Sequence, residues 1–424
     1  MTVFNDPPPL RTGPAPGHPV EGPVADSAPA EDGALQFASR PGLPALLVRN
    51  MLFGFLTLGI YRFWAKTNLR RFFWASVGIG GEPLEYTGRA RELLIGFLIV
   101  MAIFVPLSVG YSALQTMLLD NAVAAGILSL AYALVLYLLI NAATWRARRY
   151  RLARTLWRGI RAGQDGSTWA YIGKAALWLL LVPLSLGLAM PWALADLARY
   201  RIVHTTWGQF RGTFSGTGRG LLRPWLLVMV LLVLPLLVCL AGAVLQAGWS
   251  TLSPAAGPQQ LAGATARAGG WLSAALLLTV LAGPVLYGYF LVRWQRWYVG
   301  HTRIGPLHFA SSLRLRDLFL YGILLVILPI AFLAAITVAG VVAVQATEEF
   351  SKLLAGILIV VFALLALGGL RVLVMLTVYT PVLRTVITAI TVQNVAAAAE
   401  AQQSLQPQMR FGEGLADSFE IGIV

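Results

Sequence analysis

The sequence predicts an all-α protein, a polytopic transmembrane helical bundle with internal repeats. Hydrophobic residues make up 58% of the chain and charged residues 12%, which lies outside the usual range of soluble domains. Several apolar windows reach the roughly 18–20 residues that a helix needs to cross a bilayer core. Clusters of arginine separate these windows, as is typical of the cytoplasmic loops of multi-pass membrane proteins.

The chain begins with a segment that we expect to be a disordered cytoplasmic tail. Residues 1–40 are rich in Pro, Ala and Gly, including the run Pro7, Pro8 and Pro9. Such a composition buries too little apolar surface to offset the entropy lost on ordering. We therefore predict a tail at 1–40, a transmembrane domain at 41–400 and a C-terminal cytoplasmic tail at 401–424.

Six apolar stretches are predicted to cross the membrane as helices, because an open sheet would leave backbone groups unsatisfied in lipid. They lie at about 93–112, 122–142, 224–246, 271–292, 318–344 and 353–379.

Two further apolar elements are short or broken. One covers about 45–63 and the other about 171–195, where Pro183 and Pro191 interrupt it. The second is either a single crossing or a hairpin broken near Pro183–Gly187 that returns to the same side. A single crossing would place half of the arginines outside the cell, so the positive-inside rule favours the hairpin.

Four basic clusters hold 23 of the chain's 32 Lys and Arg residues. They lie at 62–91, 145–161, 199–223 and 293–316. The segments expected on the opposite side of the membrane hold only Arg267 and Lys352. Lys and Arg mark cytoplasmic loops, so we predict that all four clusters, and both termini, lie in the cytoplasm.

Internal repeats accompany these clusters. Leu58-Gly59 recurs 128 residues later as Leu186-Gly187, and Arg149-Tyr150-Arg151 recurs 50 residues later as Arg199-Tyr200-Arg201. The chain is therefore interpreted as a duplicated unit of a short apolar element, a basic aromatic segment and a helical pair. The predicted parts are repeat units at about 45–161 and 171–316 and a final helical pair at 318–379.

The basic aromatic segments supply the candidate site residues. In the second cluster, Arg151, Arg154, Arg158 and Arg161 would share one face of a helix lying in the membrane interface. Ordinary topogenic charge with aromatic anchoring, a site for anionic lipid, and a surface for a cytoplasmic partner are the three alternatives. The candidate lipid or partner contacts are Arg71, Arg151, Arg154, Arg158, Arg201 and Arg296. The candidate interfacial anchors are Trp64, Trp157, Trp192 and Trp207.

No catalytic, cofactor-binding or metal-binding residue is predicted. The lone cysteine, Cys239, lies in an apolar run, and the histidines lack the clustered carboxylates or thiols of a metal site. The formal net charge is +14, but the basic residues lie between hydrophobic spans, where anionic headgroups are nearer than nucleic acid. Membrane lipid is therefore the expected partner, and the sequence leaves a protein partner or homo-oligomer open.

Residues 56–66, Leu-Thr-Leu-Gly-Ile-Tyr-Arg-Phe-Trp-Ala-Lys, resemble the YjgN-like family of bacterial inner-membrane proteins, a domain of unknown function. Tyr-Thr-Gly at 86–88, Glu-Leu-Leu-Ile-Gly-Phe at 92–97 and Gly-Glu-Gly-Leu-Ala-Asp at 412–417 are similar to that family's pattern as well. The middle repeats depart from it, since Pro191 stands where the first copy has Phe63. The resemblance implies location in the bacterial inner membrane and carries over no substrate or catalytic residue.

Two functional hypotheses follow. The first is a non-enzymatic role in the handling or passage of a small solute or lipid, motivated by the repeats and the proline-broken element. The alternative is a structural or regulatory membrane protein whose arginine-rich cytoplasmic surface binds anionic lipid or a protein partner. An enzyme is not expected, because the sequence shows no recognisable nucleophile motif.

Overall fold

The computed structural model of the chain describes residues 33–247, 258–345 and 349–401. The predicted tails fall largely outside the described residues, at 1–32 and 402–424. Residues 33–37, which the sequence analysis assigned to the N-terminal tail, form two short strands instead. They are ordered because their backbone pairs with strands from distant parts of the chain.

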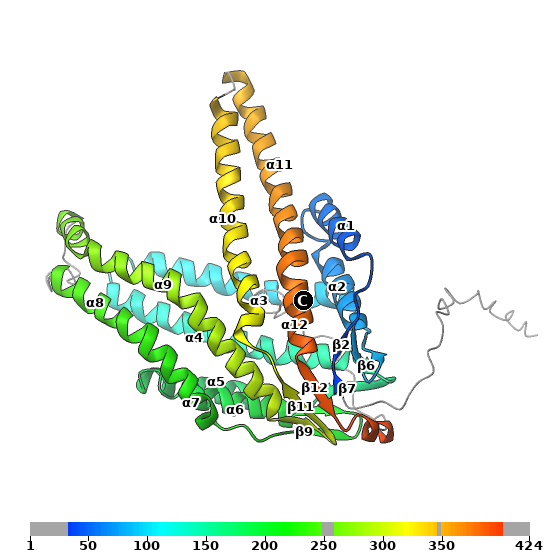
Figure 1. Cartoon of the computed structure of the whole chain (residues 1–424). Helices are drawn as coiled ribbons and strands as arrows, with labels where there is room; N and C mark the ends of the chain where they lie inside the picture. The colour runs from blue at the N-terminus through cyan, green and yellow to red at the C-terminus, as the bar shows by residue number, and fades with distance from the viewer. Residues whose placement is uncertain (1–32, 248–257, 346–348, 402–424) are drawn as a thin grey trace, which may run out of the picture.

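Helices make up most of the described chain (Figure 1). They are α1 (Leu43–Leu56), α2 (Arg62–Ser76), α3 (Ala90–Met117), α4 (Ala122–Ala153), α5 (Thr168–Leu184), α6 (Met190–Val203), α7 (Gly218–Val228), α8 (Leu234–Ala247), α9 (Pro258–Gly300), α10 (Leu315–Gln345), α11 (Glu349–Val374) and α12 (Thr380–Thr388). Single π-helical turns join α7 to α8 and α11 to α12.

The predicted membrane spans are confirmed. Within the described residues, six helical stretches are long and apolar enough to cross a bilayer, and each overlaps one of the six predicted spans. No more than 17% of the most apolar window of any of them is buried inside the protein. Large apolar surfaces that stay uncovered in water mark interaction or membrane sites. The chain is therefore a multi-pass membrane protein.

The prediction contained no strands, and the structure adds them. They are β1 (Gly33–Ala34), β2 (Gln36–Phe37), β3 (Val77–Ile79), β4 (Glu82–Pro83), β5 (Glu85–Tyr86), β6 (Thr155–Trp157), β7 (Ile160–Gln164), β8 (Thr205–Trp207), β9 (Phe210–Phe214), β10 (Thr302–Ile304), β11 (Leu307–Ser311) and β12 (Ile390–Gln393). Nine of them form one antiparallel sheet in the order β1-β12-β11-β10-β9-β8-β7-β6-β5, and the remaining three form the sheet β2-β3-β4.

The two sheets close into a barrel. Residues 33–37 form β1, which pairs with β12, and then β2, which pairs with β3. Residues 82–86 form β4, which pairs with β3, and then β5, which pairs with β6. The long sheet has β1 at one edge and β5 at the other. Because β2 continues from β1 and β4 continues into β5, and both pair with β3, neither edge of the long sheet is left open. Closure removes the exposed edges that would otherwise pair with other chains.

Tight turns alternate with helical hairpins around this barrel. Two-residue turns join β3 to β4, β6 to β7, β8 to β9 and β10 to β11. Glycine with a positive φ occurs in each of them, at Gly80, Gly81, Gly159, Gly208 and Gly305, as hairpin turns of this length require. The helical segments α1–α2, α3–α4, α5–α6, α7–α9 and α10–α12 join five further neighbouring strand pairs, and β1 pairs with β12 from the other end of the described chain. Every helical hairpin therefore leaves the barrel and returns to it on the same side.

This connectivity decides between the two alternatives for residues 171–195. Helix α5 ends at Leu184 and α6 begins at Met190. The break therefore lies at the position predicted from the prolines and Gly187. The strand before α5 pairs with the strand after α6, with Gln164 opposite Thr205. The element is therefore a hairpin and makes no net crossing.

The turns of the two short hairpins share their backbone conformation. Leu58 and Gly59 have φ values of 50° and 88°, and Leu186 and Gly187 have 52° and 85°. The amide N–H two residues after each of these glycines donates to a hydroxyl oxygen of the same turn: Tyr61 N–H donates to Thr57 Oγ1, and Ala189 N–H donates to Ser185 Oγ, both at 2.9 Å. A glycine is needed at the second position because the left-handed region penalises a Cβ atom.

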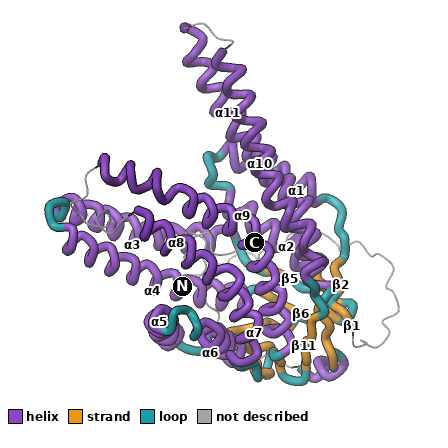
Figure 2. Tube along the Cα trace, turned by 60° about the vertical axis from the view of Figure 1, so that its left-hand side comes forward, coloured by secondary structure: helices purple, strands orange, loops and turns teal. Residues whose placement is uncertain are grey.

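The three long hairpins splay from the barrel. In Figures 1 and 2, α10 and α11 rise from it in one direction, while α3–α4 and α8–α9 extend in another. Helices α8 and α9 pack chiefly on each other, whereas α4 packs more on α5 than on α3. The long hairpins leave many large apolar side chains exposed, as helices surrounded by lipid do.

The interfacial helix predicted over Arg151–Arg161 is wrong. Helix α4 ends at Ala153, and β6, a tight turn and β7 follow. Thr155 Oγ1 donates to the Arg151 carbonyl at 2.8 Å, which satisfies one of the acceptors at the end of the helix. Arg158 and Gly159 both have positive φ and form the turn, so a continuous helix cannot run through them.

Candidate functional site

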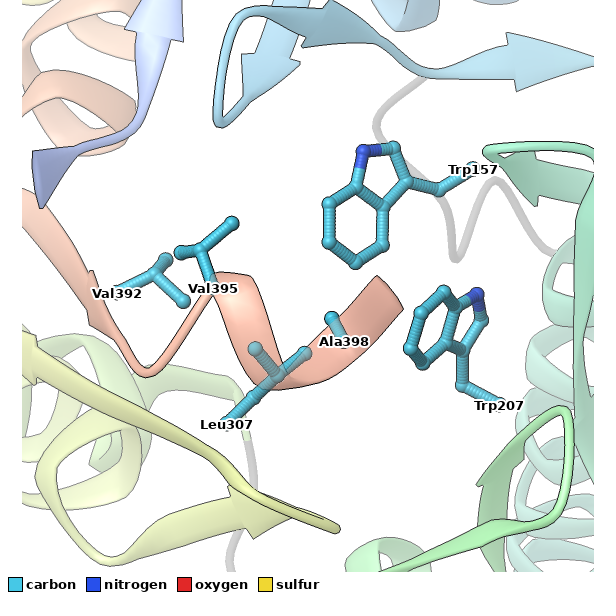
Figure 3. Packing of buried hydrophobic residues seen from close by; sticks show 6 residues of the cluster. All are labelled: Trp157, Trp207, Leu307, Val392, Val395 and Ala398. Carbon is cyan, nitrogen blue, oxygen red and sulfur yellow. The ribbon is translucent and has the colours of Figure 1, made fainter. Parts of the chain in front are cut away.

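The barrel interior is apolar and aromatic (Figure 3). Trp157 and Trp207 are 4% and 6% exposed, and their ring centroids lie 4.8 Å apart. In antiparallel sheets, directly opposed residues point to the same face. Trp157 opposes Ile160, and Trp207 opposes both Ala162 and Phe210, so these side chains line one continuous inner face.

A short segment of the chain's own C-terminal part fills this interior. After β12, residue Asn394 adopts φ 64°, and the chain turns into a 3-10 helix at Ala396–Glu400. Val395 and Ala398 are each 1% exposed and pack with Trp157 and Trp207. Figure 3 shows this helix surrounded by strands from early, middle and late parts of the chain. We call residues 395–401 the plug.

The two tryptophans of the interior were predicted as interfacial anchors, and the structure corrects this. Their rings are buried against the plug and against each other, because strand alternation turns them inward. Trp192 is 39% exposed and Trp64 is half-buried beside Tyr61, 6.2 Å away between ring centroids. Only these two of the predicted anchors remain available to a membrane surface.

Several buried indoles keep an unpaired N–H group. Among the described residues they are Trp145, Trp157, Trp207, Trp294 and Trp297. A buried donor without a partner costs about 1–3 kcal/mol. Two of these donors, those of Trp157 and Trp207, belong to the barrel interior.

The outer face of the barrel carries basic residues. Thr206 opposes Gly163 and Arg211, and Arg303 opposes Thr213 and His308. These residues alternate with the inward-facing set, so Arg211 and Arg303 point outward, as Arg161 does by the same register. The side chain of Arg211 is 70% exposed and contacts Asp165 at 3.2 Å, which also contacts His204 at 2.8 Å.

Some of the predicted arginine contacts are held inside the protein. Arg154 Nη2 donates to Glu92 Oε1 at 2.8 Å, with side chains 13% and 19% exposed. The other carboxylate oxygen of Glu92 accepts from the Tyr150 hydroxyl at 2.5 Å. This cluster ties the start of α3 to the end of α4. Arg154 is thus occupied by a structural ion pair.

Three more of the predicted residues have internal partners. Arg158 Nε lies 3.3 Å from Glu82 Oε1. Arg71 donates to the Gly88 carbonyl at 3.0 Å and remains exposed. Arg201 donates to the Tyr171 hydroxyl at 2.6 Å. Of these three contacts, the one between Arg158 and Glu82 joins two of the basic clusters.

The other two predicted arginines lie at helix ends. Arg151 is half-buried in the last turn of α4, while Arg296 is exposed on α9, near the exposed Arg293. The structure thus gathers all six predicted arginines around the barrel. It divides them into those that hold the fold and those that face outward.

Sequence reasoning missed Arg148, which joins four elements. Its guanidinium donates to Gln164 Oε1 at 2.7 Å, to Thr205 Oγ1 at 2.9 Å and to the Arg201 carbonyl at 3.3 Å. All three are neutral acceptors, so a positive charge is held between α4, β7, α6 and β8. Nothing in the local sequence distinguishes Arg148 from its neighbours, because its partners lie 16 to 57 residues away.

A family model described as a bacterial protein of unknown function, DUF898, matches residues 42–417. This match is consistent with the resemblance noted in the sequence. Searches among curated proteins and among solved structures give no significant match.

Proposed function

The chain belongs to the DUF898 family of bacterial proteins of unknown function, and we propose that it is a non-enzymatic protein of the bacterial inner membrane that binds anionic phospholipid around its barrel. The observation that carries this proposal is the gathering of all four basic clusters at one end of the spans. Lipid handling is then the role that the geometry supports best.

The outward-facing arginines form the proposed contact surface. Exposed arginines of the four clusters are Arg62, Arg71, Arg89, Arg91, Arg146, Arg199, Arg211, Arg219, Arg223, Arg293, Arg296, Arg303, Arg314 and Arg316. A guanidinium suits phosphate oxygens because its planar fork donates two parallel hydrogen bonds. Each basic residue near an anionic leaflet contributes about 1 kcal/mol to membrane association.

The positive-inside rule places the barrel in the cytoplasm, and cysteine labelling tests this. We expect Asp120→Cys, at the exposed tip between α3 and α4, to react with a membrane-impermeant maleimide in intact spheroplasts. Ser312→Cys, exposed beside the barrel, should react only after lysis. Both variants carry Cys239→Ser, which removes the native thiol. The opposite pattern would refute the orientation.

Lipid retention tests the proposed binding. Arg293→Gln, Arg296→Gln and Arg303→Gln combined should lower the anionic lipid retained in native mass spectrometry about tenfold or more, since three charges are lost from the contact surface. Arg267→Gln with Lys352→Gln is the matched control, because the sequence places those two charges on the other side of the membrane. Equal loss in both variants would contradict the proposal. Unchanged lipid with loss of a co-purifying protein would favour the regulatory alternative.

Passage of a small solute is the second candidate, and one observation favours it. In the broken hairpin α5–α6, Lys174 Nζ lies 2.8 Å from Asp196 Oδ1, and Trp178 Nε1 donates to Asp196 at 3.0 Å. An ion pair within an apolar hairpin is a candidate contact for a polar solute. Purified protein in liposomes that moves a solute, with loss of flux in Asp196→Asn, would establish this role.

A further inference from the structure

The two short hairpins, α1–α2 and α5–α6, end in exposed apolar tips. Leu58 is 95% exposed and Leu186 is 82% exposed, and both have a positive φ. Leucine is unfavourable in this left-handed region of the backbone, which glycine, asparagine and aspartate occupy more readily. Strain that is kept at an exposed position points to a function of the side chain. A large apolar side chain at the same position of both turns therefore indicates apolar surroundings.

Exposed apolar side chains continue from the tips along the arms of both hairpins. In α5, Leu177, Leu180 and Leu184 are exposed, and their spacing of three and four residues places them on one face of the helix. The exposed apolar residues near the tip of α1–α2 are Leu52, Phe53, Phe55, Leu56 and Ile60. Apolar surfaces of this extent mark sites of contact with a protein or a membrane.

The bilayer is the surrounding that fits these tips. Every helical hairpin leaves the barrel on the same side, so the short hairpins extend toward the membrane together with the long ones. Helix α5 packs on α4, and α1 packs on α11, and both α4 and α11 contribute to membrane spans. The exposed apolar surface of the short hairpins is therefore continuous with the surface that faces lipid. Trp169, 80% exposed in the first turn of α5, suits the headgroup level, where indoles are enriched.

Charged residues set the depth that α5–α6 can reach. The charges nearest to its tip are Lys174 and Asp196, whose side chains pair with each other at 2.8 Å. Residues 175–195 between them carry no charge. The ten residues from 175 to Leu184 rise roughly 15 Å as a helix, which is about half of a hydrocarbon core of ~30 Å. The tip of this hairpin can therefore reach the middle of the bilayer but cannot cross it.

The charges around α1–α2 allow a shallower position. Arg62 follows the tip closely, and its guanidinium lies 4.3 Å from the centre of the Phe97 ring. A charged group deep in the bilayer is costly, and a long side chain near the boundary avoids this cost by extending to the headgroups. The six residues 51–56 before the turn rise roughly 9 Å, so Leu58 lies closer to the headgroups than Leu186 does.

We propose that α1–α2 and α5–α6 are re-entrant hairpins, whose tips insert into the leaflet nearest the barrel and contact its acyl chains. Leu186 lies near the middle of the bilayer, and Leu58 lies nearer to the headgroups. This contact uses apolar side chains and none of the outward-facing arginines. It therefore needs no anionic lipid and is separate from the lipid surface proposed above.

Fluorescence quenching of the full-length protein in phosphatidylcholine liposomes tests the depth of both tips. In a Cys239→Ser background, a nitrobenzoxadiazole label is attached to Leu58→Cys or to Leu186→Cys. The matched control is Gln209→Cys, exposed in the tight turn between β8 and β9 at the opposite end of the barrel. Phosphatidylcholine carries no net charge, so the result does not depend on the proposed binding of anionic lipid.

A nitroxide near the end of the acyl chain should quench the label at Leu186→Cys about twofold more than a nitroxide near the headgroup, because this tip lies deeper than the first carbons of the chain. The label at Leu58→Cys should show the reverse preference, and the label at Gln209→Cys should be quenched by neither lipid. Quenching at Leu186→Cys no stronger than at Gln209→Cys would overturn the proposal.

Reaction with a water-soluble maleimide separates a re-entrant hairpin from the other arrangements. From either face of the membrane, Leu186→Cys should react at least about tenfold more slowly than Gln209→Cys does from the barrel side, since a thiol among acyl chains forms little thiolate. Both should react equally after denaturation in dodecyl sulfate. Rapid reaction of Leu186→Cys from the barrel side would place the tip in water, and rapid reaction from the other side would show a full crossing. A thiol that is protected but whose label is quenched by neither lipid would reveal a protein contact, and each of these three results would overturn the proposal.

Discussion

Gly212→Ala is expected to prevent accumulation of the folded protein. Gly212 is buried in the middle of β9, and a Cβ atom there would lie 2.1 Å from the carbonyl oxygen of Ile202. That oxygen belongs to the backbone at the end of α6, so no side-chain rotation can relieve the overlap. Overpacking commonly costs about 1–3 kcal/mol, and a clash between two backbone segments should lie at or above the upper end.

The loss of stability would not be confined to the contact with α6, because β9 lies between β8 and β10 in the barrel. Moving β9 away from α6 breaks its pairing with one of these neighbours. We expect a loss of monodisperse protein in fluorescence-detected size-exclusion chromatography, or a markedly lower apparent melting temperature. The latter is a kinetic quantity if unfolding is irreversible.

Gly126→Ala is the matched control for this substitution. Gly126 lies inside α4, and a Cβ atom there meets nothing within 4 Å. Replacing a helical glycine by alanine stabilises by roughly 0.5–1 kcal/mol, so this variant should be at least as stable as the parent. If Gly212→Ala matches it, then α6 does not pack on β9 as described.

The long spans could be predicted from sequence because their signal is local. A run of about 20 apolar residues predicts a membrane helix. In each of the six stretches this pattern is complete within the stretch and needs no information from distant residues. The break after Leu184 was equally visible, since Pro183 and Gly187 both oppose continuation of a helix. In these elements the chemistry of neighbouring residues is sufficient.

The barrel could not be predicted in the same way. Its strands are two to five residues long, too short for an alternating apolar pattern to stand out. Most of them also pair with a strand on the far side of a helical hairpin, as Trp207 does with Ala162. Turn chemistry was the available signal, because Arg158-Gly159 and Gly305-Pro306 each stand between two apolar residues.

For the candidate arginines too, the sequence predicted the location and the tertiary structure determines the contacts. Clustering of charge located them at one end of the spans, as topology requires. Which of them bind inside the protein depends on carboxylates distant in sequence, and Glu92 lies 62 residues from Arg154. The pattern of arginines therefore indicated the region, while the tertiary structure determines which residues remain free.

The ion pair between Glu92 and Arg154 supplies the second large expected effect. In Glu92→Leu, the guanidinium of Arg154 and the hydroxyl of Tyr150 both lose their acceptor in a mostly buried position. Breaking a buried pair by removing one partner costs about 3–5 kcal/mol, because the remaining charge is left uncompensated. We expect the apparent melting temperature of Glu92→Leu to fall well below that of the parent.

Removing both charges should be less harmful than removing one. In Glu92→Leu/Arg154→Leu no buried charge is left unpaired, and apolar replacements of buried ion pairs are often near neutral. The double variant should therefore be more stable than Glu92→Leu alone, which a double-mutant cycle of melting temperatures measures. Additive losses would instead show that the two side chains are not coupled. In that case the start of α3 and the end of α4 would be held together chiefly by apolar packing, and the arginine would be free to face the membrane surface as the sequence first suggested.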